Sequence, residues 1–221
     1  MANLEKICKE IRRDIINASY LANACHIGSA LSCVEILVNL YWKTLKKNDV
    51  FIFSKASGAS ALYAVLAKKG YFKKEKLTHY LKNYPLASTE VPGVVHSVGS
   101  LGHGLPVAVG MALANRKRNV YVLLGDADVQ EGTFYESLLF ARKHLLKNLY
   151  ILIDRNGLQA CGHTEDILGI ELALAQLKVI FPFAVLYTVK GWGVDFMEHD
   201  YTWHYKNLDK ETYEKALLQL S

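Results

Sequence analysis

Two short apolar runs with a helical segment between them constrain the fold of this chain more than any other feature. Residues 120–124 and 149–153 are continuously apolar and are closely bounded by Gly, Asn or Asp. Residues 132–144, between them, have a helical pattern. Continuously apolar strands in a strand-helix-strand order are typical of a parallel sheet that helices cover on both faces. We therefore predict an α/β fold of three layers, with a parallel sheet between two layers of helices.

The rest of the chain supplies further helices and two more strands. Apolar residues recur at three- and four-residue spacing in residues 4–16 and 30–45, which predicts two helices joined by a loop that carries His26. Strands are expected at residues 50–53 and 183–189, and helices at residues 58–69, 74–82, 105–114, 169–177 and 210–220, the last beginning near Asp209. No linker divides the 221 residues, so we expect one domain over residues 1–221.

Composition excludes several classes of protein. With 51% hydrophobic and 21% charged residues, the chain is not intrinsically disordered. Basic residues exceed acidic ones, 26 to 21, but they are scattered in pairs, without the aromatic-interleaved stripe of a nucleic-acid face. The apolar runs are too short to span a membrane. With no Cys-x-x-Cys pair and no signal peptide, we expect a cytoplasmic protein with reduced thiols at Cys8, Cys25, Cys33 and Cys161.

Polar residues leave the two best-defined strands where ligands of parallel sheets bind. Asp126 follows the first strand and Asn156 the second, and the carboxyl ends of neighbouring parallel strands meet at one edge. Carboxylate and amide oxygens are donors that Mg²⁺ or Ca²⁺ accepts. A helix that begins near Glu131 would point its amino terminus there, which favours a phosphate. One interpretation is a metal diphosphate site; the other is that Asp126 caps a helix and Asn156 forms a turn.

Two other motifs fail on spacing. A calcium loop counted from Asp126 has its Gly one place late and has Ser137 where Glu is required, so an EF-hand is excluded. Residues 99–104 (GSLGHG) reverse the dinucleotide fingerprint and lack the Lys of a P-loop, although their glycines enter a helix. Taken alone, these glycines are a weak signal for a phosphate-binding loop.

Five groups of residues stand in an order that is specific when they are taken together. They are residues 26–32 (HIGSALS), 54–55 (SK) with 61–63 (ALY), 92–94 (PGV) with 99–102 (GSLG), Gly125-Asp126-Ala127 with Asn156, and 190–193 (KGWG) with 203–204 (WH). In this order, nearly end to end, the chain resembles the amino-terminal, diphosphate-binding half of transketolases, in the form that is split into two polypeptides. The resemblance implies the thiamin diphosphate-binding fold.

The resemblance also implies roles for individual residues. The cofactors would be thiamin diphosphate and Mg²⁺ (or Ca²⁺), with the metal held by Asp126, Asn156 and the backbone carbonyl of Leu158. Three candidate catalytic residues follow: His26 and His204 would line the channel and hydrogen-bond substrate hydroxyls or the diphosphate, and Glu131 would belong to an acidic network that links cofactors across an interface. The other implied cofactor contacts are Ser57, Gly99, Leu101, Gly125 and Ala127.

The chain departs from the family pattern at several places. Ala127 replaces the second Gly of the Gly-Asp-Gly signature, and Ser57 stands where the family usually has His. A hydroxyl at this position can donate one hydrogen bond but cannot carry a positive charge. Residues 84–91 lack a second family His, and the stretch of residues 167–183 is short, which suggests the loss of a helix and a strand at the sheet edge.

The activity that the resemblance implies is transfer of a two-carbon ketol unit from a ketose, free or phosphorylated, to an aldose acceptor. The Glu that activates the cofactor lies on the other half of the enzyme in this family. We therefore expect an inactive chain when alone, and a dimer of heterodimers with a pyrimidine-binding partner chain. Two alternatives remain. One is a degenerate, non-catalytic subunit of the same fold. The other is a thiamin enzyme related to deoxyxylulose-phosphate synthase, which residues 203–204 (WH) resemble less than they resemble a transketolase.

Overall fold

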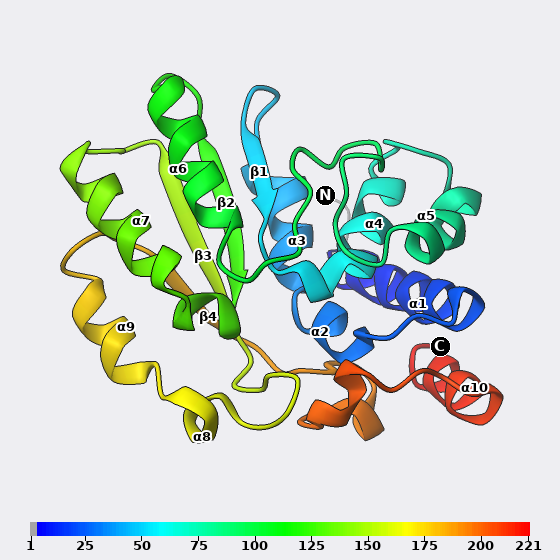
Figure 1. Cartoon of the computed structure of the whole chain (residues 1–221). Coiled ribbons are helices and arrows are strands. Elements are labelled where there is room, and N and C mark those ends of the chain that lie inside the picture. The colour runs from blue at the N-terminus through cyan, green and yellow to red at the C-terminus, as the bar shows by residue number, and fades with distance from the viewer. Residues whose placement is uncertain (1–3) are drawn as a thin grey trace.

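A four-stranded parallel sheet lies at the centre of the computed structural model, which describes residues 4–221 (Figure 1). Its strands follow the order of the chain, and each pairs in parallel with the next. They are β1 (Val50–Phe53), β2 (Val120–Gly125), β3 (Leu149–Arg155) and β4 (Ala184–Tyr187). The predicted parallel α/β fold is confirmed.

Helices cover both faces of this sheet (Figure 1). One layer contains α1 (Leu4–Ala22), α2 (Ile27–Ser32), α3 (Val34–Asn39), α4 (Ala59–Lys68) and α5 (Leu77–Asn83), and α10 (Lys210–Gln219) packs on α1. The other layer contains α6 (Gly104–Ala114), α7 (Gly132–Lys143) and α9 (Glu171–Leu177), which follows the short α8 (Thr164–Leu168). Short connections are 3₁₀ or π turns: Leu40–Thr44, Ala56–Gly58, Lys74–Lys76, Ala127–Gln130, Asp195–Met197 and Tyr201–His204.

The alternation of side chains along the strands divides the core in two. Phe51, Phe53 and Leu123 pack into the cluster beneath α1–α5, whereas Ile52 and Val122 pack into the cluster beneath α6 and α7. Successive strand residues point to opposite faces, so a strand covered on both faces must be apolar throughout. All six residues of β2 are buried, as the apolar run predicts.

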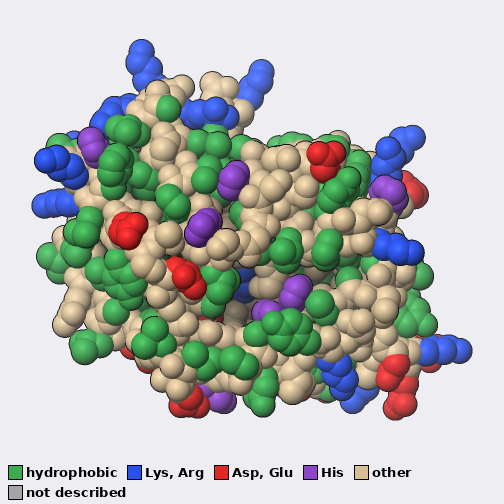
Figure 2. Space-filling view, viewed as in Figure 1, with side chains coloured by type: hydrophobic (Ala, Val, Ile, Leu, Met, Phe, Trp, Pro, Cys, Tyr) green, Lys and Arg blue, Asp and Glu red, His purple; other side chains and the backbone are tan. Residues whose placement is uncertain are grey.

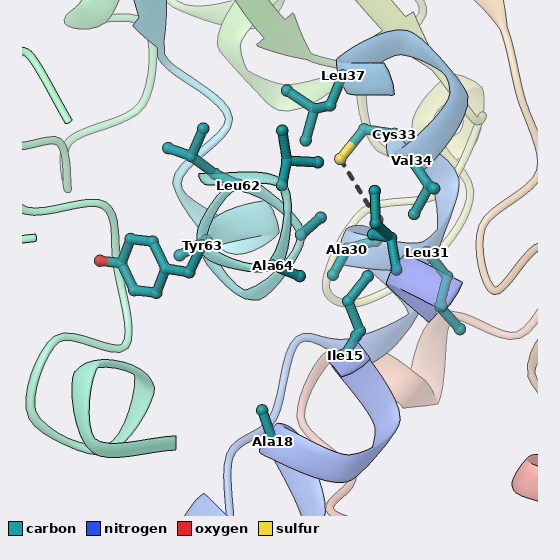
Figure 3. Packing of buried hydrophobic residues seen from close by; sticks show 14 of the residues in the cluster. Ile15, Ala18, Ala30, Leu31, Cys33, Val34, Leu37, Leu62, Tyr63 and Ala64 are labelled. Atoms are coloured by element: carbon teal, nitrogen blue, oxygen red, sulfur yellow. Dashed lines mark hydrogen bonds between the residues drawn. The ribbon is translucent and has the colours of Figure 1, made fainter. Parts of the chain in front are cut away.

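Figure 3 shows the first of these clusters from close by. Ile15 of α1, Leu31 of α2 and Leu37 of α3 belong to this one cluster, and all three side chains are fully buried. Tyr63, on α4, points its ring away from the cluster towards the loop after α5 (Figure 3), where its hydroxyl donates to the carbonyls of Tyr84 (3.1 Å) and Leu86 (2.8 Å). This contact anchors the long loop that leads to residues 99–103.

Several predicted elements have different bounds, and three of them show why. The helix expected over residues 30–45 begins at Ile27 and is interrupted at Cys33, whose φ of −99° and ψ of 7° leave the helical range and whose thiol donates to the carbonyl of Ala30. The helix expected over residues 169–177 is α9, which begins two residues later because Gly169 is extended (φ −61°, ψ 132°), and the short α8 before it is not predicted. Strand β3 continues two residues beyond its apolar run, since ion pairs compensate the burial of its last two residues.

Other predictions concern the chain as a whole. Helix α10 begins beside Asp209 as predicted, with a capping box in which the Asp209 carboxylate accepts from the backbone N–H of Thr212 at 2.8 Å. The four cysteines are free thiols, and burial raises the pKa of Cys33 to about 12. Across residues 4–221, no helix has both the length and the apolar character that crossing a membrane requires.

Candidate functional site

A cavity of about 350 Å³ opens at the carboxyl ends of the strands. Segments that follow β1, β2 and β3 line it, together with the loop before α2, the loop before α6 and the segment after β4. Figure 2 shows this face of the molecule hollowed, with histidine side chains beside the hollow. The structure brings together here all but one of the predicted site residues: His26, Ser57, Gly99, Leu101, Gly125, Asp126, Ala127, Asn156, Leu158 and His204.

Asp126 and Asn156 lie next to each other, as the strand-end argument predicts. The register pairs Gly125 with Asp154, so the residues that follow these two meet at the sheet edge. The Asp126 carboxylate accepts from the backbone N–H groups of Asn156 (3.1 Å) and Gly157 (3.4 Å). Its side chain does not cap the 3₁₀ turn that follows it. Asp126 stands at the N-cap position of that turn, but its carboxylate accepts from the segment after β3 and is not the side-chain cap of the alternative interpretation.

Asn156 does have the turn geometry of the alternative interpretation. Its side-chain oxygen accepts from the backbone N–H of Leu158 at 3.0 Å, which is an Asx-type turn. The same turn brings the Leu158 segment to the wall of the cavity. A turn and a ligand site are compatible here, because an amide oxygen has two lone pairs.

Arg155 is a site residue that the sequence analysis missed. It ends β3, its side chain is 6% exposed, and its guanidinium forms an ion pair with Asp126. It also donates to Glu165 (2.7 Å) and Glu171 (2.9 Å). Burial raises the pKa of Asp126, and the neighbouring guanidinium opposes this effect. The sequence does contain a signal for this residue, because an Arg stands between Asp154 and Asn156 at the end of an apolar run, where the strand-end argument places the site.

A second buried ion pair joins Lys55 to Asp154 below the cavity. Asp154 also accepts from the hydroxyl of Ser32 at 2.7 Å, and Lys55 donates to the same hydroxyl at 2.8 Å. Although burial opposes the charged form of Lys55, the carboxylate beside it raises the pKa of this lysine above its ordinary value. The pair connects the segment after β1 to β3 and α2, and so supports the floor of the site.

Asp128 fastens three loops together around the cavity. Its carboxylate accepts from the backbone N–H groups of Gly102 (2.6 Å) and Gly125 (2.7 Å), and from the hydroxyl of Ser54 (3.1 Å). Burial raises the pKa of Asp128 to about 6, against the opposing effect of these donors. The side chain therefore holds the glycine-rich loop against the end of β2, which is a structural role.

His26 and His204 come from opposite ends of the chain and lie in edge-to-face contact, with ring centroids 4.7 Å apart. The backbone N–H of His26 donates to the carbonyl of His204 at 2.8 Å. Burial, followed by the charge of Lys190, lowers the pKa of both histidines, that of His204 to about 3. Both rings are therefore neutral at pH 7 and act as hydrogen-bonding groups without charge. His26 has a φ of +67°, which few residues other than Gly adopt.

Lys190 is a third buried cation beside the site, after Arg155 and Lys55, and it is not among the predicted site residues although it lies in one of the five motifs. The residue is 1% exposed, and its ammonium group donates to the carbonyl of Gln159 at 2.8 Å and lies 3.4 Å from that of Leu158 and from Nδ1 of His204. Its stem passes Gly28, where a Cβ atom would lie 3.2 Å from Cγ of Lys190. Burial lowers the pKa of Lys190 to about 8.

Glu131 does not line the cavity. A 3₁₀ turn, Ala127–Gln130, separates it from Asp126, and Glu131 stands directly before α7. The start of the 3₁₀ turn, and not the amino terminus of α7, therefore borders the cavity, so the expected helix-terminus contribution to phosphate binding is wrong. Glu131 packs instead against Gly102, where its Cβ would lie 2.9 Å from an added Cβ atom.

The donor atoms around the cavity fit a divalent cation with an anionic ligand better than a cation alone. Within residues 4–221 no group of three or more His, Cys, Asp or Glu side chains could hold a metal ion. Asp126, the Asn156 amide and the Leu158 carbonyl offer hard oxygen donors, and further ligands would have to come from phosphate oxygens. Gln159, which lines the same cavity, has a buried side-chain N–H₂ group with no hydrogen-bond partner in the described chain. An anion with several oxygens could satisfy that amide.

Comparison with known proteins identifies relatives over the whole chain. Residues 1–180 match the family model of 1-deoxy-D-xylulose-5-phosphate synthase. A protein named as one subunit of apulose-4-phosphate transketolase, from Actinobacillus succinogenes, is 37% identical, over 98% of this chain and 95% of that protein. The subunit of the same name from Phocaeicola vulgatus is 32% identical, over 99% and 94%. The alignment to the first relative has 265 positions, so it opens gaps in this 221-residue chain.

Solved structures agree in fold. Transketolase from Campylobacter jejuni superposes with a TM-score of 0.86 at 24% identity, and transketolase from Leishmania mexicana with a TM-score of 0.82 at 20% identity. Each match covers all of this chain but 43% and 45% of the solved chains, respectively. The chain therefore spans less than half the length of these solved proteins.

Proposed function

The chain belongs to the transketolase family, and from this membership we propose that it is the diphosphate- and metal-binding subunit of a two-chain, thiamin diphosphate-dependent transketolase. The observation that carries the proposal is the single cavity at the strand ends, which combines Asp126 and Asn156 with His26 and His204. Two relatives whose names make them single subunits of a transketolase match this chain over nearly their whole length, which supports a split enzyme.

The cofactor would lie along this cavity with its diphosphate at the strand ends. Asp126, Asn156 and the carbonyl of Leu158 would hold Mg²⁺ or Ca²⁺ together with diphosphate oxygens. Gln159 and Ser57 would donate to the anion, with contacts from the cavity residues Gly99, Leu101, Gly125 and Ala127. The ammonium of Lys190, buried behind the Gln159 segment, would add a positive charge near the anion without touching it. When bound, thiamin diphosphate supplies a carbon nucleophile and an electron sink for cleavage of a ketose.

The two histidines would orient the sugar. Because both imidazoles are neutral, each ring has one N–H donor and one acceptor nitrogen for a substrate hydroxyl. Their edge-to-face contact and the backbone hydrogen bond between them fix their relative positions. Tyr205, whose ring lies 4.7 Å from that of His204, extends this wall towards solvent. The reaction would transfer a two-carbon ketol unit from a ketose or ketose phosphate to an aldose.

A partner chain would complete the active site. In the family, the pyrimidine end of the cofactor is bound by the other half, together with the Glu that activates it. We propose a dimer of heterodimers in the cytoplasm, in which this single domain pairs with a pyrimidine-binding chain. Glu131, which lies outside the cavity, would act at the interface and not on the substrate.

Calorimetric titration of the full chain with thiamin diphosphate, in Mg²⁺ and then in EDTA, tests the cofactor site. We expect binding in Mg²⁺ that EDTA abolishes and that Asp126→Asn abolishes as well, because this change removes the carboxylate charge with little change of shape. Asp166→Asn, which removes an exposed carboxylate outside the cavity, is the matched control and should bind as the unmodified chain does. Equal binding by Asp126→Asn and the unmodified chain would contradict the site.

Two other functions have a specific observation in their favour. The family model is that of 1-deoxy-D-xylulose-5-phosphate synthase, so the chain with its partner should also be offered pyruvate as donor. Turnover of pyruvate but not of ketoses would replace transketolase with that activity. The ion pair between Asp126 and Arg155 favours a degenerate, non-catalytic subunit. That function predicts that Asp126→Asn leaves the activity of the reconstituted pair unchanged, whereas we expect near-complete loss.

A further inference from the structure

The guanidinium of Arg155 holds a permanent positive charge against the Asp126 carboxylate, which would bind a divalent cation in the proposed function. Its guanidinium pairs with Asp126, and the two side chains are 6% and 2% exposed. Two like charges in a region of low dielectric oppose each other strongly, so this cation would weaken the binding of Mg²⁺ at Asp126. For the proposed metal site to bind a cation, another group must therefore offset the positive charge of Arg155.

Two glutamates from the α8–α9 segment supply that offset. Glu165, on α8, accepts from Nη2 of Arg155 at 2.7 Å, and Glu171, on α9, accepts from Nε at 2.9 Å. Together with Asp126 they surround one guanidinium with three carboxylates. The group therefore keeps a net negative charge, which a divalent cation can balance.

Further contacts hold the two glutamates in place. Glu165 also accepts from the backbone N–H of Ile170 at 3.2 Å, and Glu171 accepts from the hydroxyl of Tyr187, on β4, at 3.4 Å. The side chain of Gln130, in the turn after Asp126, donates to the carbonyl of Leu168 at 2.6 Å. These contacts hold the α8–α9 segment against the carboxyl edge of the sheet, next to Arg155.

We propose that Glu165 and Glu171 are positioning residues that hold the Arg155 guanidinium and so leave the Asp126 carboxylate available to a divalent cation. The inference rests on the proposed function, since it concerns the same metal site. The Asp126 carboxylate accepts hydrogen bonds from two backbone N–H groups, so its orientation does not depend on Arg155. Without the glutamates, the guanidinium has Asp126 as its remaining charged partner and competes with the cation.

The test measures Mn²⁺ binding to the full chain at saturating thiamin diphosphate, from the electron paramagnetic resonance signal of free Mn²⁺. We expect Glu165→Gln/Glu171→Gln to weaken Mn²⁺ binding at least tenfold. Glu165→Gln alone should weaken it measurably, whereas Asp166→Asn, which removes the same charge from the neighbouring position of α8, should stay within twofold of the unmodified chain. Circular dichroism on each variant confirms that the fold is retained.

Adding Arg155→Met to the double variant distinguishes this positioning role from a merely structural one. Since the competing charge is then gone, Mn²⁺ affinity should return to that of the unmodified chain or exceed it. A triple variant that binds as weakly as the double variant, or a double variant that binds normally, would overturn the inference. Failure of the unmodified chain to bind Mn²⁺ would instead overturn the proposed metal site, so the two outcomes are distinct.

Discussion

Lys190 is a buried residue beside the site whose charge state affects stability. Burial lowers its pKa to about 8 from the ordinary value of 10.5. Between these two pH values the unfolded chain binds more protons than the folded chain, so this group makes the free energy of unfolding rise as pH increases from 8 to 10.5. One pKa unit corresponds to about 1.4 kcal/mol, so the rise is at most about 3 kcal/mol.

Lys190→Met should remove this pH dependence. Urea unfolding of both chains at pH 7.5, 9 and 10.5 measures it, and comparison of the two chains cancels the contributions of other titrating groups such as Cys33. We expect the stability of the unmodified chain to increase relative to that of the variant over this range. Parallel pH profiles would show that Lys190 titrates normally.

For single residues, the sequence predicts the oxygen donors of the site better than its buried cations. Asp126 and Asn156 follow from a rule about strand ends, and the structure places both at the cavity. Arg155 and Lys190 do not follow, because a hydropathy pattern gives no reason to bury a cation. Each is buried by partners that are distant in sequence, such as Glu171 for Arg155 and the Gln159 carbonyl for Lys190.

Among the elements, the loop after β4 depends on one glycine. Gly191 has a φ of +84°, and an added Cβ atom would lie 2.1 Å from the carbonyl oxygen of Met197. Its N–H donates to the carbonyl of Gly28 at 3.0 Å, which joins this loop to α2. The loop carries Lys190 and leads to His204, so its position decides the shape of the cavity.

Gly191→Ala and Gly70→Ala form a matched pair for this loop. Gly70 has nearly the same φ, +83°, but no atom within 4 Å of an added Cβ. Positive φ alone costs an alanine about 1–2 kcal/mol. We expect Gly191→Ala to lose at least about 2 kcal/mol more than Gly70→Ala in urea unfolding, because the Met197 backbone must also move. Similar losses in the two variants would show that the loop adapts without strain.

The sequence predicts long periodic elements better than short ones. Helices α6 and α7 lie within one residue of their predicted bounds. Helix α8 is not predicted and α9 begins two residues after its predicted start, since periodicity does not show that Gly169 is extended or that Glu165 and Glu171 turn towards one guanidinium. The polar contacts that orient this segment join residues distant in the sequence, which periodicity does not report.

For the whole molecule, the proposed cofactor should appear as a gain in stability. A ligand at 100 times its dissociation constant stabilises the folded state by about 2.7 kcal/mol, if it does not bind the unfolded chain. For a chain of this length that corresponds to a rise in Tm of roughly 5–10 °C. We expect this rise with thiamin diphosphate and Mg²⁺, but not in EDTA or in Asp126→Asn, when measured by differential scanning calorimetry. A rise that persists in EDTA would indicate binding without the metal.

The overall architecture follows from the sequence because the strongest pattern in the sequence, apolar strands separated by helices, extends over much of the chain. Continuously apolar strands separated by helices permit few arrangements other than a parallel sheet with two helical layers. The order of the strands and their shared carboxyl edge then bring the site residues together. What the pattern does not contain is the set of ion pairs beneath that edge, which depends on distant side chains such as Lys55 and Asp154.

The contact between the two ends of the chain has a consequence for biosynthesis. Ser29 and His204, which both line the cavity, are 175 positions apart. A ribosome adds roughly 5–20 residues per second, and contacts between distant residues form late because long loops must close first. Helices α1 to α5 emerge while the wall that His204 contributes has not yet been translated. The pocket is therefore completed only after His204 has left the ribosome, and a nascent chain cannot use the whole pocket before that point.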